Sequence, residues 1–219
     1  MGGALPKPLV RVGGVPLAER AVRSLLAVGI HEIAMVVGYR AREVMTALAQ
    51  LPVEFIVNDE FEQPNGVSVC AAESFVEERS LLLMADHVFQ PWMLWPLVAQ
   101  SPRGDDLLLA VDRDIDGVFD LADATKVRTS GNRIAEIGKT ISPFDSVDTG
   151  LFCIPPMLCE VLGILDAPQL SDGVRALARG GLARVVDVTG GRWVDVDTPV
   201  ARAEAEKLLY GEPEYAPAA

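Results

Sequence analysis

The sequence predicts an α/β fold in which a mostly parallel sheet carries helices on both faces. Short apolar segments typical of buried strands occur at 33–37, 53–57, 80–87 and 107–111, and segments with helical periodicity lie between them. Strands and helices that alternate at such short intervals form doubly wound sheets. Half of the residues are hydrophobic, so a chain of this length can bury a large core without disulfide bonds.

The first half of the chain is expected to contain four helices. Pro16 opens the first and Gly29 closes it, and an apolar stripe faces the core between them. The other three are expected at 41–51, 65–76 and 92–100. Trp92 and Trp95 have helical spacing, which favours packing in the core, although two aromatic rings could also enclose a quaternary ammonium group.

The pattern changes after Asp112. The aspartate-rich stretch 112–123 is expected to be a loop, and 126–129 and 133–137 are expected to form a hairpin. Further strands are expected at 147–154, 185–188 and 193–196, and helices at 157–164 and 173–179. Thr198 and Pro199 are typical of a helix start, and the last helix is expected to end at Gly211. We therefore expect a single domain over 1–211 and a disordered tail over 212–219.

The chain is acidic, with 31 Asp and Glu against 19 Lys and Arg and a net charge of -12. This excess argues against nucleic acid or an anionic membrane surface as a partner. The sequence shows neither an apolar segment of bilayer-spanning length nor a signal peptide, and the expected location is the cytoplasm. The three cysteines lack metal-ligand spacing, so we expect free thiols that pack in the core.

The segment Ser80–His87 places an acidic residue where this fold class binds ligands. A run of apolar residues ends there in Asp86 and His87. Ligands of open α/β sheets lie outside the carboxyl ends of the strands. A carboxylate at that edge can bind Mg²⁺, which commonly accompanies phosphate groups. Asp86 could equally cap the following turn, and this fragment alone does not decide between the two interpretations.

A series of short motifs is more specific in its order than any motif is alone. The series consists of Pro6-Lys7-Pro8-Leu9, Asn65-Gly66, Asp86-His87, Ala124-Thr125-Lys126-Val127, Ile137-Gly138-Lys139, Asp148-Thr149-Gly150 and Asp195-Val196-Asp197-Thr198-Pro199. With these motifs, nearly the whole chain resembles the NTP transferases that couple a nucleoside triphosphate to a sugar or polyol phosphate. It is most similar to the CTP:inositol-1-phosphate cytidylyltransferases. The resemblance implies a Rossmann-like, doubly wound mixed sheet of the nucleotide-diphospho-sugar transferase type.

The resemblance also implies a reaction and a metal. A phosphate oxygen of the acceptor, inositol-1-phosphate, would attack the α-phosphorus of CTP and release pyrophosphate. Two anions meet in this reaction, so positioning and charge neutralisation supply most of the catalysis. A Mg²⁺ ion held by Asp86 and Asp197 suits this task. Asp197 could instead be a second capping residue beside Thr198.

Three lysines are implied to bind phosphate groups. Lys7 would contact the nucleotide, with Pro6 and Pro8 restricting its backbone. Lys126 and Lys139 would bind the acceptor phosphate or neutralise charge during transfer. Their alternative is a simple ion pair with Asp123 or Asp145, and the alternative for Lys7 is a solvated surface lysine.

The remaining motifs are implied to contact the base and the acceptor. Asn65 and Gly66 would lie near the base, although Asn-Gly is also an ordinary turn before a helix. Asp148, with Thr149 and Gly150, would meet the acceptor hydroxyl groups, or Asp148 would only fix the turn at Gly150. His87 would orient Asp86, contact the substrate, or be a hydrogen-bonded structural residue.

The sequence departs from the family pattern at its start. The family opens with a buried strand and a glycine-rich loop whose backbone cradles the triphosphate. Met1 lies where that loop should end, so we expect the strand and most of the loop to be absent and the neighbouring strands to lack a partner. Our hypothesis is that the recorded start lies downstream of the real one, and we expect weak turnover from this form.

Two alternatives to the cytidylyltransferase remain open at this point. One is a phosphocholine or sugar-1-phosphate nucleotidyltransferase, and the other is a catalytically silent nucleotide-binding relative. In several relatives the domain is fused to a membrane enzyme that consumes the CDP-alcohol. Here we expect such a CDP-alcohol phosphotransferase to be a separate partner, and the sequence leaves open whether the chain forms a homodimer.

Overall fold

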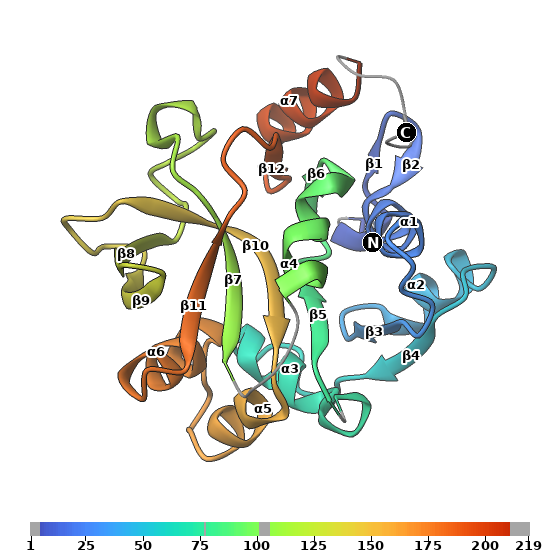
Figure 1. Ribbon diagram of the computed structural model, residues 1–219. Coiled ribbons are helices and arrows are strands. Elements are labelled where there is room, and N and C mark those ends of the chain that lie inside the picture. The colour runs from blue at the N-terminus through green and yellow to red at the C-terminus, as the bar shows by residue number, and fades with distance from the viewer. Residues whose placement is uncertain (1–4, 77, 101–105, 211–219) are drawn as a thin grey trace.

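A mixed sheet forms the centre of the computed structural model, which describes residues 5–76, 78–100 and 106–210 (Figure 1). Only β7 and β11 pair in parallel within this sheet, and the other pairings are antiparallel. The strands lie in the order β5 (Ser80–Leu83), β10 (Ser146–Ile154), β7 (Leu107–Asp112), β11 (Ala183–Asp187), β9 (Arg133–Gly138) and β8 (Lys126–Ser130).

The doubly wound α/β architecture and the mixed sheet implied by the resemblance are both confirmed. The expectation of a mostly parallel sheet is wrong for the central sheet. The reason is β10, which follows the β8–β9 hairpin and runs antiparallel between β5 and β7. The hairpin itself forms as predicted from its turn residues.

Three smaller strand pairs flank the central sheet. They are the antiparallel pair β1 (Arg11–Val12) and β2 (Val15–Pro16), the parallel pair β3 (Ala34–Val37) and β4 (Glu54–Val57), and the antiparallel pair β6 (His87–Phe89) and β12 (Trp193–Asp195). Among the described strands, β3 pairs only with β4 and β5 pairs only with β10. One edge of β3 and one edge of β5 therefore lack a strand partner within the described part of the chain.

The segment Ser80–His87 is not one continuous buried strand. Strand β5 ends at Leu83, residues 84–86 turn, and His87 begins β6. All four residues of β5 are half-buried, whereas every residue of β7, further into the sheet, is buried. The prediction of a buried strand is wrong here, because among the described strands β5 has a neighbour on one side only.

Helices cover both faces of the central sheet. The described helices are α1 (Leu17–Ala27), α2 (Ala41–Ala47), α3 (Asn65–Ala71), α4 (Trp95–Gln100), α5 (Pro156–Gly163), α6 (Leu170–Arg179) and α7 (Pro199–Tyr210), with 3-10 turns η1 (Lys7–Leu9), η2 (Glu73–Phe75), η3 (Pro91–Leu94) and η4 (Ile115–Gly117). Along β7, Leu108 and Ala110 join the core cluster of α1 and α4, and Leu107 and Leu109 join that of α5 and α6. This alternation is the period of two that a strand buried on both faces requires.

Several local predictions can be compared with the structure. Thr198 caps α7 through its Oγ1, which accepts the Ala201 N–H at 3.0 Å. Helix α2 ends at Ala47, four residues before the expected end. The three cysteines are free, as expected. The tail 212–219 and Gly211 lie outside the described residues, and the single domain over 1–211 stays a prediction.

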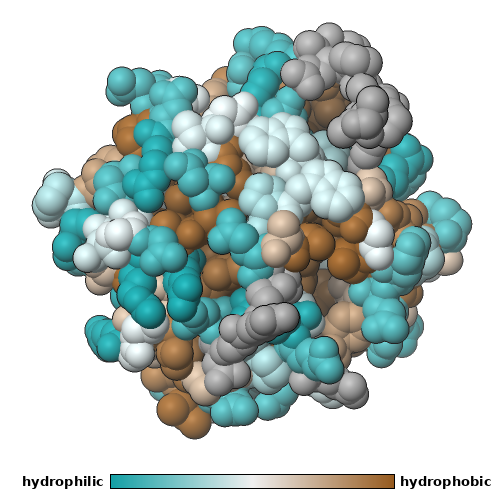
Figure 2. Space-filling view, in the orientation of Figure 1, coloured by the Kyte–Doolittle hydropathy of each residue, from teal (hydrophilic) through white to brown (hydrophobic). Residues whose placement is uncertain are grey.

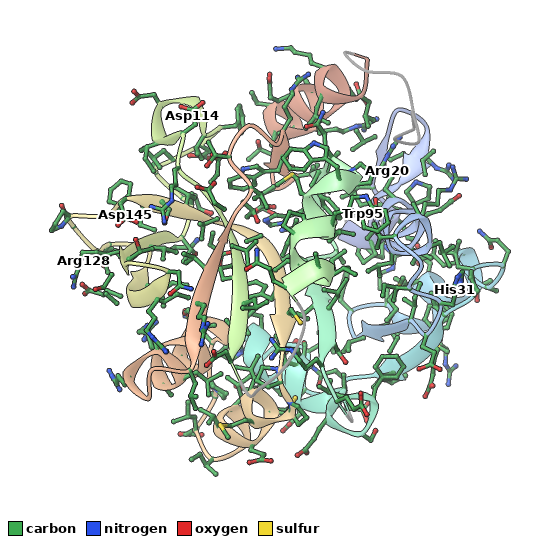
Figure 3. The ribbon with its side chains drawn as sticks, in the orientation of Figure 1. Arg20, His31, Trp95, Asp114, Arg128 and Asp145 are labelled. Atoms are coloured by element: carbon green, nitrogen blue, oxygen red, sulfur yellow. The ribbon has the colours of Figure 1, made fainter. Side chains whose placement is uncertain are left out.

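The two tryptophans expected in the core are exposed instead. Trp92 lies in η3 and Trp95 begins α4, and they are 42% and 52% exposed. Trp95 is labelled on α4 in Figure 3, and the pale region at the centre of the space-filling view lies over the same helix (Figure 2). Met93, Leu94 and Leu97 fill the core beneath them. The described helices include none that is long and apolar enough to cross a membrane.

Candidate active site

A cavity of about 510 Å³ lies at the end of the central sheet where β5 turns into β6. Its wall combines segments that are far apart in the sequence. They are the β5–β6 turn, the loop before β8, the middle of β10, the start of α6 and the end of β12. The position agrees with the expected ligand crevice at the carboxyl ends of the strands.

Asp86 and Asp197 converge at one end of this cavity. The Lys7 ammonium donates to Oδ2 of Asp86 at 3.3 Å and also to Oδ1 of Asp197. The backbone joins the same two segments, because the Val196 N–H donates to the Asp86 carbonyl at 3.0 Å. The carboxylates of Asp86 and Asp197, which are predicted to bind one metal ion, therefore both contact the ammonium group of Lys7.

Asp195 is a third acidic residue at this end, and its motif alone did not predict a role for it at the site. Asp195 is a member of two groups of potential metal ligands. One group contains Asp86 and His87, and the other contains Asp123 and Asp197. Its Oδ1 is buried without a hydrogen-bond partner among the described residues. Alternation along the extended segment 195–197 offered a signal, because the two aspartates share a face while Val196 packs in the core.

His87 holds Asp86 from the side opposite Lys7. Its Nδ1 lies 3.1 Å from Oδ1 of Asp86, so the two oxygens of this carboxylate have different partners. The imidazole stacks on the indole of Trp193, with ring centroids 6.1 Å apart and an interplanar angle of 4°. Burial alone would raise the pKa of Asp86, but the His87 hydrogen bond and the charges of His87 and Lys7 hold it well below its usual range.

The motif 148–150 forms the wall beside His87. Oδ1 of Asp148 accepts the Gly150 N–H at 2.7 Å, and Gly150 has a φ of +76°. Both residues line the cavity. Burial raises the pKa of the Asp148 carboxyl to about 6. Asp148 thus fixes the turn and faces the cavity as well, so the two alternatives considered for it are compatible.

Residues 1–125 match the model of the MobA-like NTP transferase domain. The chain belongs to this family. The resemblance seen in the motifs is therefore confirmed at the level of the NTP transferases.

Two relatives match this transferase domain over 94% of its length. A protein of Rubrobacter xylanophilus, named bifunctional IPC transferase and DIPP synthase, is 39% identical over 214 residues, and a protein of the same name from Archaeoglobus fulgidus is 34% identical over 212 residues. The matched parts make up 48% and 41% of these relatives. The chain thus spans about half the length of the curated relatives it matches.

Solved structures share the fold. The inositol-1-phosphate CTP transferase from T. maritima superposes with a TM-score of 0.83 at 24% sequence identity, covering 95% of this chain and 89% of that one. A UDP-glucose pyrophosphorylase complexed with UDP-glucose gives a TM-score of 0.77 at 16% identity, with 94% and 90% covered. These similarities establish the nucleotide-diphospho-sugar transferase architecture.

The lysines of the transferase domain differ in their surroundings. Lys139 lines the cavity and forms an exposed ion pair with Asp123 at 2.7 Å. Lys126 is buried, and its ammonium donates to the Ala122 carbonyl at 2.9 Å. The side chain of Lys126 is not part of the described cavity wall, so its predicted role at the acceptor phosphate requires it to leave this carbonyl.

Asn65 and Gly66 hold the loop before α6 in place. Oδ1 of Asn65 accepts the Leu170 N–H at 2.8 Å, and the Gly66 N–H donates to the Pro168 carbonyl at 3.1 Å. Asn65 lines the cavity, whereas Gly66 is buried and packs tightly against Pro168. The loop before α6 approaches the backbone of Gly66 so closely that position 66 requires a glycine.

Thr149 points away from the cavity. It is fully buried, and its hydroxyl donates to the Ala110 carbonyl at 2.9 Å. It lies between Asp148 and Gly150 on β10, so alternation along the strand turns it to the opposite face. The geometry gives Thr149 a role in joining β10 to β7. Trp92 and Trp95 are likewise absent from the described cavity wall.

The acidic end of the cavity fits a hard divalent cation. Asp195 belongs to one group of potential ligands with Asp86 and His87 and to another with Asp123 and Asp197, and carboxylate oxygens are the ligands that Mg²⁺ prefers. The Oδ1 of Asp195 accepts no hydrogen bond among the described residues and lies 3.9 Å from the His87 Nδ1. This is a further sign, because a buried carboxylate oxygen is stabilised by a donor or a cation. Asp86 and Asp197 are the residues that would hold the ion, with Asp195 beside them.

Proposed function

We propose that this chain is the nucleotidyltransferase domain of a Mg²⁺-dependent enzyme that couples CTP to inositol-1-phosphate and releases pyrophosphate. One observation carries the proposal: Asp86 and Asp197 meet the same ammonium group at the wall of a polar cavity. The names of the relatives support the choice of nucleotide and acceptor.

The side chains near the acidic end suit the nucleotide. A Mg²⁺ ion bound there would neutralise charge on the phosphates of CTP. Lys7 would contact the triphosphate, and its backbone is fixed because the 3-10 turn η1 is closed by the Val10 N–H to Lys7 carbonyl bond at 2.9 Å. Asn65 lines the cavity, and its amide nitrogen would contact the nucleotide base.

The opposite part of the wall suits a phosphorylated polyol. Asp148, Gln169 and Ser171 are polar residues of this wall, and a ring of hydroxyl groups needs such donors and acceptors. Lys139 would meet the acceptor phosphate once it releases Asp123, an exposed partner that contributes little to stability. Gly150 completes the wall beside Asp148.

The activity is tested by the release of pyrophosphate. The acceptors are inositol-1-phosphate, phosphocholine and glucose-1-phosphate, each combined with CTP or UTP. We expect the fastest release with CTP and inositol-1-phosphate. Replacement of Asp86 or Asp197 by Asn should lower turnover by about 100-fold or more.

Asp187→Asn is the matched control for these substitutions. Asp187 pairs with Arg113 and is not part of the described cavity wall, so turnover should be unchanged. Faster release with another acceptor would reassign the substrate. Full activity in both Asn variants would disprove the metal site.

We propose in addition that a further strand and its glycine-rich loop complete the sheet between β3 and β5 in the active enzyme. The edges of these two strands that lack partners among the described residues support this, as does the half-buried state of all four β5 residues. In Figure 2, apolar side chains are visible between the region of α4 and that of β3 and β4.

The strand proposal is tested with a version of the chain extended upstream in its reading frame. We expect pyrophosphate release to be weak with the 219-residue chain and strong with the extended one. Equal turnover by both would contradict the strand proposal. No release by either, with any acceptor, would contradict the proposed transferase.

We propose that the CDP-alcohol product passes to a second, CDP-alcohol-consuming phosphotransferase activity, and that the reaction takes place in the cytoplasm. The bifunctional name of the curated relatives supports the first part. Co-purification of the chain with such an enzyme would test it. A homodimer remains a prediction, which the mass of the protein in solution would decide.

A further inference from the structure

The ammonium of Lys7 lies between the two carboxylates that are proposed to hold the metal ion. It contacts Oδ2 of Asp86 and Oδ1 of Asp197 at the same time. Two cations cannot share these oxygens closely, because like charges repel strongly at short range. The metal and this lysine therefore exclude each other at this pair of carboxylates.

The surroundings allow the lysine to leave while Asp86 stays. His87 holds Oδ1 of Asp86 at 3.1 Å, so the loss of Lys7 frees only Oδ2. The Lys7 side chain is 52% exposed, and its length and flexibility let it reorient without movement of the backbone. The backbone itself is held by the bonds from Leu9 to Pro6 and from Val10 to Lys7.

The other lysines near the cavity are not competitors for this position. Lys139 is paired with Asp123, and Lys126 donates to the Ala122 carbonyl. Within the described residues, the lysine ion pairs of Asp86 and Asp197 both come from Lys7.

We propose that Lys7 is a displaceable counter-ion of the metal site, which a divalent cation expels from Asp86 and Asp197 when it binds. This inference rests on the proposed metal site and adds how that site is regulated. The expelled ammonium is then available to a phosphate group of the nucleotide. Without nucleotide the metal binds weakly, because it must displace Lys7 and the displaced ammonium has no new partner. With nucleotide present the metal binds tightly, because a phosphate group pairs with the displaced ammonium.

The coupling works in both directions. If the nucleotide gives Lys7 a new partner, it strengthens metal binding, and the metal strengthens nucleotide binding by the same factor. A chain without the lysine loses both the competition and the coupling. Removal of a residue that assists catalysis should therefore tighten metal binding, which a simple phosphate-binding lysine would not predict.

The experiment measures Mn²⁺ binding to the full chain by electron paramagnetic resonance, first without nucleotide. Lys7→Met and Lys7→Gln should bind Mn²⁺ about fivefold more tightly than the wild type, because each removes two competing ion pairs. Addition of CTP should tighten Mn²⁺ binding in the wild type, and much less in either variant. Circular dichroism confirms that each variant is folded.

Two controls separate the inference from the proposed function. Lys207→Met removes the same charge and an exposed ion pair, with Glu204, but no contact with Asp86 or Asp197, and should change Mn²⁺ affinity by less than about twofold. Asp197→Asn should abolish the Mn²⁺ site. If no folded chain binds Mn²⁺, the metal site of the proposed function fails and the inference fails with it.

The inference alone fails under two other results. One is Mn²⁺ binding that depends on Asp197 yet is unchanged or weakened in both Lys7 variants. The other is equal tightening in Lys207→Met and Lys7→Met, which would show a general effect of charge. In either case the proposed transferase stands, with Lys7 as a residue that contacts phosphate only.

Discussion

Gly150 lies against the imidazole of His87 so closely that a Cβ atom at position 150 would come within 2.7 Å of the His87 Cδ2. The glycine also has a φ of +76°, a conformation that other residues rarely adopt. The histidine in turn holds Asp86. The motif 148–150 and the motif 86–87 thus depend on each other sterically.

The first prediction concerns this contact. Gly150→Ala should lower the free energy of unfolding by about 2–4 kcal/mol, because it adds the strain of a positive φ to an overpacked contact with His87. Gly190→Ala is the matched control, since Gly190 has a φ of +91° and a Cβ atom added there would have no neighbour within 4 Å. It should cost about 1 kcal/mol. Urea denaturation measures both, and equal losses would show that the contact with His87 does not matter.

The second prediction concerns the pH dependence of stability. The folded chain holds the pKa of Asp148 near 6, above the ordinary value of 3.8. Between these values the folded state keeps a proton that the unfolded state has lost, so stability falls as pH rises from 4 to 6. The charge of His87, which faces Asp148, opposes this shift. Asp148→Asn should remove this part of the fall, on the order of 2 kcal/mol.

Asp145→Asn is the control with the opposite sign. Burial alone would raise the pKa of Asp145, but hydrogen bonds from Thr129 and Ser146 and the charge of Arg113 lower it. Its contribution to stability is present at neutral pH and lost in acid, so the variant should lose more stability at pH 7 than at pH 3. Urea denaturation at several pH values measures both variants. A parallel pH dependence in wild type and Asp148→Asn would contradict the raised pKa of Asp148.

The third prediction separates Thr149 from its neighbours on β10. Thr149→Val keeps the shape of the side chain but leaves the Ala110 carbonyl without its donor, which should cost about 1 kcal/mol of stability. The KM for the acceptor should be unchanged, because Thr149 faces away from the cavity. Thermal unfolding and steady-state kinetics test this. A raised KM in a variant of unchanged stability would return Thr149 to the acceptor site.

Parts of the fold with strong local signals can be predicted from the sequence. The β8–β9 hairpin follows from its turn at 130–132, and the start of α7 follows from the hydroxyl of Thr198. The direction of β10 cannot be predicted in the same way. An apolar run such as 147–154 is equally compatible with parallel and antiparallel neighbours, and its insertion between β5 and β7 depends on long-range packing.

The site is predictable where chain direction alone determines the position. Asp86 follows a strand, and Asp197 precedes a helix, so both reach the sheet edge. The surroundings of Lys126 and Trp95 are not predictable in this way. A buried lysine with a carbonyl partner and an exposed tryptophan both contradict the average burial of their residue types. Asp195 ends a strand of only 3 residues, which is too short for alternation to give more than a weak signal.

The fourth prediction separates the two sides of the Asn65 amide. Its oxygen accepts the Leu170 N–H, whereas no hydrogen bond from its nitrogen is found among the described residues, and the residue lines the cavity. Asn65→Asp keeps the acceptor and removes the donor, so stability should stay within about 0.5 kcal/mol of the wild type while the KM for CTP rises. Asn65→Ala loses both groups and should also lose about 1 kcal/mol of stability.

The pair of variants distinguishes a loop anchor from a nucleotide-binding residue. If Asn65 only anchors the loop before α6, Asn65→Asp should retain the wild-type KM for CTP and Asn65→Ala should change stability alone. If the amide nitrogen contacts the base, both variants raise the KM, and the rise in Asn65→Asp occurs without a change in unfolding. Two measurements distinguish these outcomes: steady-state kinetics with CTP varied at saturating acceptor, and urea denaturation. The amide oxygen affects the free energy of unfolding, whereas the amide nitrogen affects the KM for CTP.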